Sequence, residues 1–178
     1  MRGLTKFDDK YFEKYSDKPV KIIPFSKRQV KIGDIYLDRL RKLLVGLDCR
    51  FMLRGSSLFG ISGKGEVEVG IYPKEKNWKE VLKKLAKKYG EPENLEKHYA
   101  RFNDEYEEVE IEIIVLKDHD AQVDLALHKY LVSKPKLLRE YEKIKKRSAF
   151  SKREYMKEKN KFLAGVIEEI PDNYLAKN

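Results

Sequence analysis

Two carboxylates two residues apart, Glu66 and Glu68, are the side chains of this sequence best suited to chemistry. They belong to the alternating stretch Glu66-Val-Glu-Val-Gly-Ile-Tyr72, in which a strand would project both from one face. Gly55-Ser56-Ser57 precedes them, and nine residues separate Ser56 from Glu66. Glycine lets the backbone approach a phosphate, and nearby N–H and hydroxyl groups can bind its oxygens. Because clustered carboxylates hold divalent cations, these residues predict phosphate and Mg²⁺ (or Mn²⁺) binding.

Simpler explanations compete with this hypothesis. Alternating glutamates are also typical of the solvent face of an antiparallel strand, and most glycine-rich stretches are turns. The order strand, Gly-Ser, short loop and strand with paired acids favours the site, because it resembles the nucleotidyltransferase signature. In that signature, acids on either side of an apolar residue follow Gly-[Gly/Ser] after about ten residues. A third carboxylate would complete the usual metal geometry, and Glu110 or Glu112 is the candidate.

Hydrophobic periodicity predicts the elements that position these residues. Residues 49–54 and 66–72 alternate as strands. The first strand is expected to end at Gly55-Ser56-Ser57, and a loop that carries Gly60, Gly63 and Gly65 is expected to join it to the second. Ser26 and Gln29 have the spacing of a capping box that opens a helix to about Gly46. The other predicted elements are an edge strand at 20–24, a helix at 78–89, strands at 98–102 and 107–116, and helices at 123–132, after Ser133 and after Ser151. Strands interleaved with helices, then a helical tail, indicate an α+β fold.

Length and composition bound the kind of protein. With 178 residues, 41% of them hydrophobic, the chain is expected to fold as one domain. The predicted boundaries are an N-terminal extension at 1–19, an α/β core at 20–120 and C-terminal helices at 121–170 that form one structural unit with the core. One cysteine, Cys49, and the absence of a long apolar run favour a cytoplasmic protein with no membrane contact.

The net charge of +9 is concentrated near the C-terminus. Residues 134–161 hold twelve lysines and arginines against four acids. Such a segment can attract nucleic acid or an acidic protein, and the competing interpretation is a solvated helix face.

Several motifs together resemble the GrpB-like proteins, a nucleotidyltransferase branch also found fused to dephospho-CoA kinase. Arg54-Gly-Ser-Ser-Leu-Phe-Gly-Ile-Ser-Gly-Lys64 is similar to that family's G-S-T-[AS]-V-P-G-L-A-A-K-P element. The segment from Leu125 to Lys145 resembles its L-A-F-R-D-Y-L-R-x-x-P-x-L-x-x-x-Y-x-x-L-K. Tyr155, Lys159 and Phe162 match its Y-x-x-x-K-x-x-F. The resemblance implies a mixed or antiparallel nucleotidyltransferase-like sheet with helices on one face and a helical tail.

The same resemblance implies roles for individual residues. Glu68 aligns with the family's principal aspartate, and Glu66 falls at an apolar position. Glu110-Ile-Glu112 replaces a His-x-His motif, and His128-Lys129 replaces Arg-Asp. The expected site residues are the acids Glu66, Glu68, Glu110 and Glu112, with Glu66, Glu68 and Glu112 as metal ligands, and Gly55, Ser56, Ser57, Lys64 and Lys159 as nucleotide-binding groups.

Two functions remain open from the sequence. The first is a protein that binds a nucleotide or phosphorylated small molecule with Mg²⁺ or Mn²⁺ and supports nucleotidyl transfer. The second is a catalytically degenerate binding or accessory module that uses its basic C-terminal helices to bind nucleic acid or an acidic partner.

Overall fold

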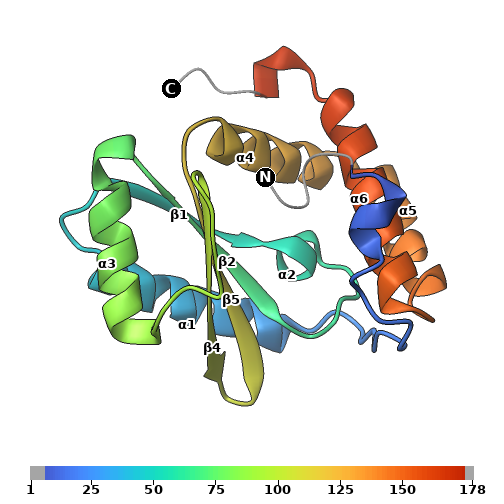
Figure 1. Ribbon diagram of the computed structural model, residues 1–178, viewed down its shortest axis with the longest axis horizontal. Helices are drawn as coiled ribbons and strands as arrows, with labels where there is room; N and C mark the ends of the chain where they lie inside the picture. Colours follow the sequence, from blue (N-terminus) through green and yellow to red (C-terminus); the bar gives the residue numbers. More distant parts are fainter. Residues whose placement is uncertain (1–6, 175–178) are drawn as a thin grey trace. The chain divides into compact units, whose positions relative to one another are not determined.

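The chain forms two compact units in a computed structural model that describes residues 7–174 (Figure 1). The sheet unit comprises Phe25–Gly60 and Gly65–Gln122. The helical unit comprises the described residues up to Pro24, the short segment Ile61–Lys64 and the residues from Val123 onward. The division falls inside helix α4 (Asp118–Val132). None of the described helices is long and apolar enough to cross a membrane.

A five-stranded mixed sheet organises the sheet unit, in the order β1-β2-β5-β4-β3. Its strands are β1 (Cys49–Arg54), β2 (Val67–Pro73), β5 (Val109–Leu116), β4 (Tyr99–Tyr106) and β3 (Asn94–Leu95). β2 and β5 pair in parallel, and the other neighbours pair antiparallel. Figure 1 labels four of these strands, β1, β2, β5 and β4. The predicted α+β class is confirmed.

Helices α1 (Lys27–Leu43) and α3 (Trp78–Tyr89) supply the core against one face of this sheet. The capping box that the sequence predicts at the start of α1 is present, with Ser26 as the N-cap. α3 ends at Gly90, whose positive φ of 84° suits glycine. The fully buried core side chains include Leu40, Leu85, Val67, Val69, Ile71, Ile111 and Ile113. Apolar residues at helical spacing therefore meet the apolar alternate positions of the strands.

The helical unit is built on α5 (Pro135–Arg147) and α6 (Lys152–Glu168), with the short helices η1 (Asp9–Phe12) and η3 (Asp172–Tyr174). The Ser151 hydroxyl caps α6, as the sequence predicts. The N-terminal segment binds α6, because the Phe7 N–H donates to Asn160 Oδ1 at 3.1 Å and Lys157 pairs with Asp9 at 2.6 Å. The predicted boundaries at 19/20 and 120/121 stay predictions, and residues 1–6 lie outside the described residues.

Segment Ile61–Lys64 is held within the helical unit by three contacts. Ile23 and Gly63 form an isolated antiparallel bridge. The Ser62 N–H donates to the Glu142 carboxylate at 3.0 Å, and the buried Lys145 ammonium donates to the Ser62 carbonyl. The predicted edge strand at 20–24 is wrong, since within residues 7–174 this segment forms one bridge alone and Pro24, which has no N–H, cannot extend it.

Two further predictions of local structure are wrong. Gly55-Ser56-Ser57 begins a short helix, α2 (Gly55–Phe59), where the sequence predicts the end of a strand followed directly by a loop. α2 ends at Gly60, and five residues are too few to show a helical period in the sequence. The predicted strand at 107–116 begins only at Val109, because Glu107 and Glu108 form the hairpin turn with φ of 51° and 61°. The short helix η2 (Glu75–Asn77) leads into α3.

Candidate functional site

The sheet face opposite the α1 and α3 core carries a polar cluster. On β2, Val67, Val69 and Ile71 point to the core, so the alternate residues Glu68 and Gly70 occupy the other face. Cross-strand partners share a face of the sheet. The register therefore places five polar side chains beside one another, which we call the polar sheet face: Arg54, Glu68, Glu112, Asn103 and Arg101.

Glu68 and Glu112 are direct partners in the parallel pairing of β2 with β5. Neighbouring strands lie about 4.8 Å apart, so the two carboxylates leave the sheet side by side. Arg54 on β1 is the antiparallel partner of Glu68, and Asn103 on β4 is the partner of Glu112. The row therefore runs arginine, glutamate, glutamate, asparagine across four strands. Such a row places two acids at its centre with a cation on one side.

Glu68 packs directly against Gly55 at the start of α2. A Cβ atom added to Gly55 would lie 2.7 Å from Glu68 Oε1 and 3.0 Å from its carboxyl carbon. Gly55 also has φ of 58°, which glycine adopts with little strain. The absence of a side chain at position 55 therefore lets the Glu68 carboxylate reach the first turn of α2. Backbone N–H groups and the helix dipole favour negative charge at such a turn.

Arg101 lies on the other side of the acid pair and is held by two carboxylates. Its guanidinium is 2.7 Å from Glu93 Oε2 and 3.8 Å from Glu112 Oε1. The Asn103 amide donates to the same Glu93 oxygen at 2.7 Å. The Arg101 Nε is buried and has no hydrogen-bond acceptor among the described residues. Arg101 thus has two carboxylate partners, and its Nε–H is a buried donor without an acceptor among the described residues.

Tyr99 lies close to all four charged groups of this cluster. Burial raises the pKa of Tyr99 to about 12; Arg101 and Arg54 lower this pKa, whereas Glu112 and Glu68 raise it. The hydroxyl therefore stays protonated at neutral pH and can donate a hydrogen bond. Gly70 leaves space for Arg54, whose Cδ lies 2.8 Å from the position of an added Cβ. The Arg54 side chain thus lies over Gly70, where the absence of a side chain gives it room.

The structure brings some of the predicted site residues together. Gly55, Glu68 and Glu112 belong to the cluster just described. Glu66 is half-buried just before β2, and Glu110 is exposed on β5 as the partner of Glu105. The other predicted nucleotide-binding residues are Ser56 in α2, Ser57, which is buried there, Lys64, which is exposed in segment Ile61–Lys64, and Lys159 on α6. Lys64 and Lys159 belong to the helical unit, and their nucleotide-binding role stays a prediction.

The donor set of the polar sheet face suits a shared metal site. In the described part of the chain, no three His, Cys, Asp or Glu side chains are arranged to hold a metal. Mg²⁺ in nucleotide sites commonly takes one or two carboxylates, with phosphate oxygens and water completing its coordination. Glu68 and Glu112 fit that smaller requirement. The predicted three-carboxylate set of Glu66, Glu68 and Glu112 stays a prediction.

Sequence reasoning missed Arg54, Tyr99 and Arg101. Tyr99 and Arg101 alternate with the buried Ala100 and Phe102, so the strand period could have placed them on a polar face. Their partners could not be found in this way, because the pairing of β4 with β5 and of β5 with β2 decides which residues meet.

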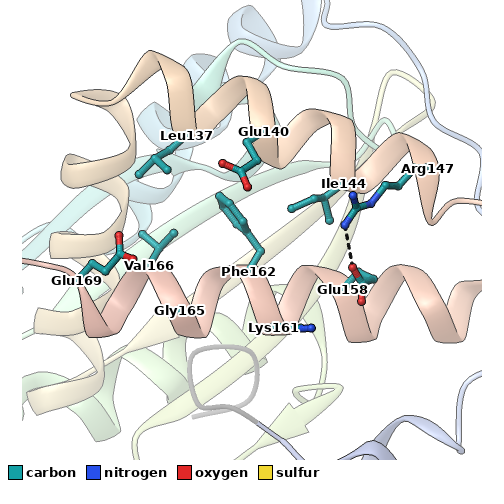
Figure 2. A pocket seen from close by; sticks show the side chains of 10 residues that line it. All are labelled: Leu137, Glu140, Ile144, Arg147, Glu158, Lys161, Phe162, Gly165, Val166 and Glu169. Carbon is teal, nitrogen blue, oxygen red and sulfur yellow. Dashed lines mark hydrogen bonds and ion pairs between the residues drawn. The ribbon is translucent and has the colours of Figure 1, made fainter.

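The helical unit has a separate groove of about 340 Å³ between α5 and α6. Figure 2 shows Leu137, Ile144, Phe162 and Val166 along it, with an ion pair between Arg147 and Glu158 at one end. None of the predicted site residues lines this groove. Its mixed apolar and charged lining gives no indication of a ligand.

Comparisons with known proteins identify the family and the fold. The family model described as GrpB protein matches residues 59–169. The crystal structure of the conserved protein GrpB from Enterococcus faecalis is similar, with a TM-score of 0.65 and 17% identity over 87% of this chain and 97% of that one. No protein in the curated set matches this chain significantly.

Solved nucleotidyltransferases share the fold at lower similarity. The STING-associated CdnE c-di-GMP synthase from Capnocytophaga granulosa has a TM-score of 0.55 and 13% identity, over 86% of this chain and 63% of that one. A Cid1 poly(U) polymerase structure with Mg 3'-dATP bound has a TM-score of 0.50 and 15% identity, over 75% of this chain and 49% of that one. At these identities the likeness shows a nucleotidyltransferase-like fold and no more.

Proposed function

The chain belongs to the GrpB family, and on that premise we propose that it binds a nucleotide together with Mg²⁺ on the polar sheet face. The pairing of Glu68 with Glu112 carries the proposal, because it sets two carboxylates side by side with Arg54 and Arg101 nearby. A metal–phosphate complex needs both kinds of group. Carboxylates bind the cation, and arginines bind the phosphate oxygens that remain.

Each residue of the cluster has a role in this proposal. Glu68 and Glu112 would hold the metal, which supplies positive charge that polarises a phosphoryl oxygen. Gly55 and Ser56 would offer their backbone N–H groups, and Tyr99 its hydroxyl, to the ligand. Arg54 and Arg101 would neutralise phosphate charge. Glu66, Glu110 and Ser57 complete the proposed residue set within the sheet unit, and nucleotide binding by Lys64 and Lys159 of the helical unit stays a prediction from the sequence.

Ligand-dependent thermal stability tests this proposal. A ligand that binds the native state raises the midpoint of unfolding. We expect at least one of the four ribonucleoside triphosphates, at millimolar concentration with Mg²⁺ or Mn²⁺, to raise it by a few degrees. Glu68→Gln should abolish that increase, while Glu80→Gln, an exposed change on α3, should retain it. No increase with any triphosphate would refute nucleotide binding, and an unchanged increase in the Glu68 variant would refute the metal assignment.

Nucleotidyl transfer is the reaction that we propose for the same site. The hydroxyl oxygen of an acceptor, or of water, would bond to the α-phosphorus of the triphosphate that stabilises the protein and lose its proton, and pyrophosphate would leave. Pyrophosphate release above the rate of Glu68→Gln would support transfer. Stabilisation without release would identify a binding protein that has lost turnover.

The alternative proposal, that the basic C-terminal helices bind nucleic acid or an acidic protein, rests on their charge. The structure weakens it, because part of that charge has partners within the helical unit. Lys146 pairs with Glu142, Arg147 with Glu158, and Arg153 with Asp17. Exposed lysines such as Lys136 and Lys152 remain at the surface for such a partner.

A further inference from the structure

Arg101 is bound to a carboxylate that the proposed metal also needs. Glu112 is 3.8 Å from the Arg101 guanidinium, and its side chain is only 15% exposed. A cation that reaches Glu112 must therefore compete with an arginine in partly buried surroundings, where screening by solvent is weak. Metal alone should bind poorly to such a site.

The other contacts of Arg101 keep it near the site when it leaves Glu112. Glu93 binds the guanidinium at 2.7 Å and is itself held by the Asn103 amide. Glu93 lies just before β3, so this anchor is separate from the row that holds Glu68 and Glu112. The buried Nε of Arg101 still lacks an acceptor among residues 7–174. A phosphate oxygen is an acceptor of the kind that an arginine binds best.

We propose that Arg101 exchanges its carboxylate partner for the phosphate of the ligand, so that metal and nucleotide bind cooperatively. In the unliganded protein Arg101 neutralises Glu112. When the metal binds Glu112, the guanidinium is released to the phosphate of the same ligand while Glu93 keeps it in place. Each ligand then removes the obstacle to the other, which is a coupling between two binding events. This inference rests on the proposed function, because it requires a metal–nucleotide ligand at this site.

A substitution of Arg101 should change the affinity for Mn²⁺ alone and the affinity for the Mn²⁺ triphosphate in opposite directions, which a purely structural role of Arg101 would not do. Arg101→Gln removes one cation from Glu112, so Mn²⁺ alone, followed by the paramagnetic resonance signal of the free ion, should bind about fivefold more tightly. The same variant loses a phosphate contact, so the triphosphate that stabilises the wild-type protein most should bind about tenfold more weakly with Mn²⁺. A variant that merely damages the fold would weaken both.

Two further variants complete the experiment. Arg101→Lys keeps the charge, so Mn²⁺ alone should bind as weakly as in the wild type. Arg28→Gln removes a cation that pairs with Glu107 at the β4–β5 turn, and it should change neither affinity.

If the wild type binds the Mn²⁺ triphosphate but Arg101→Gln does not tighten Mn²⁺ binding, the exchange is wrong and the proposed function stands. If the wild type binds no triphosphate with Mn²⁺, both are wrong.

Discussion

At the scale of single residues, two features of the structure favour glycine at position 55. Its φ of 58° lies in the left-handed region, and the Glu68 carboxylate occupies the space of a side chain. We expect Gly55→Ala to lower the free energy of unfolding by about 2 to 3 kcal/mol, from backbone strain together with displacement of Glu68. Urea unfolding measures this change.

Gly60→Ala is the matched control for that experiment. Gly60 has φ of 67°, but an added Cβ would meet nothing within 4 Å. It should cost only the backbone strain of about 1 to 2 kcal/mol. Equal losses in the two variants would contradict the close contact between Gly55 and Glu68.

The residues of the site differ in how far sequence could predict them. Glu68 was predictable, because its alternation with Val67 and Val69 places it on a face and its family position marks it as an acid. The sequence could not decide whether Glu110 or Glu112 lies beside Glu68, because both are on the same face of the same strand. The register of β2 with β5 selects Glu112 and leaves Glu110 exposed. The ion pair of Arg101 with Glu93 had no signal in the sequence at all.

At the scale of elements, the β4–β5 turn carries strain that a single substitution should relieve. Glu107 and Glu108 both have positive φ, the conformation of a two-residue turn that favours Asn-Gly. We expect Glu108→Gly to raise the free energy of unfolding by about 1 kcal/mol, measured by urea unfolding. Glu105→Gly, within β4, should lower it. A decrease in both variants would show that the turn is unstrained.

A second element, segment Ile61–Lys64, should make stability depend on acid pH. Hydrogen bonds from Ser62, and then the Lys146 ammonium, lower the pKa of Glu142 from 4.5 to about 2. The folded state therefore binds this proton more weakly than the unfolded state does. The contribution of Glu142 to stability is complete above a pH of about 4.5 and is lost as the pH falls toward 2.

Glu142→Gln removes that titration. Between about pH 5 and pH 3, the free energy of unfolding of this variant should fall less steeply than that of the wild type. Glu140→Gln, an exposed change on the same helix, should leave the slope unchanged. Parallel curves for Glu142→Gln and the wild type would mean that the Ser62 contact does not form in solution.

Local patterns predicted most elements and failed where structure depends on distant contacts. The capping box of α1 and the Gly90 terminus of α3 are local signals, and both predictions are confirmed. α2 was missed because it is shorter than the period that would reveal it. The glycine-rich stretch after α2 has the sequence pattern of a plain loop, but contacts with Ile23, Glu142 and Lys145 hold its middle part.

At the scale of the whole molecule, burial and ion pairs reduce the number of basic side chains that a polyanion can contact without breaking an existing interaction. Lys145 is buried, and several other basic residues of α5 and α6 pair with acids of their own unit. We expect retention on a heparin column to be lost at about physiological salt, because Lys146, Arg147 and Arg153 would have to leave their acidic partners to contact the polyanion. Lys136→Gln combined with Lys152→Gln should shorten retention at low salt. Strong retention at several times that salt would favour the polyanion-binding alternative.

The parallel pairing of β2 with β5 also has a consequence for the order of folding. Glu68 and Glu112 are separated by about forty residues that include α3 and the β3–β4 segment, so a long loop must close before they meet. Hairpins such as β4–β5 need only local closure and can form earlier. The pair of carboxylates is therefore expected to assemble late, after the transition state. A ligand that bridges it would then slow unfolding while leaving the rate of folding almost unchanged.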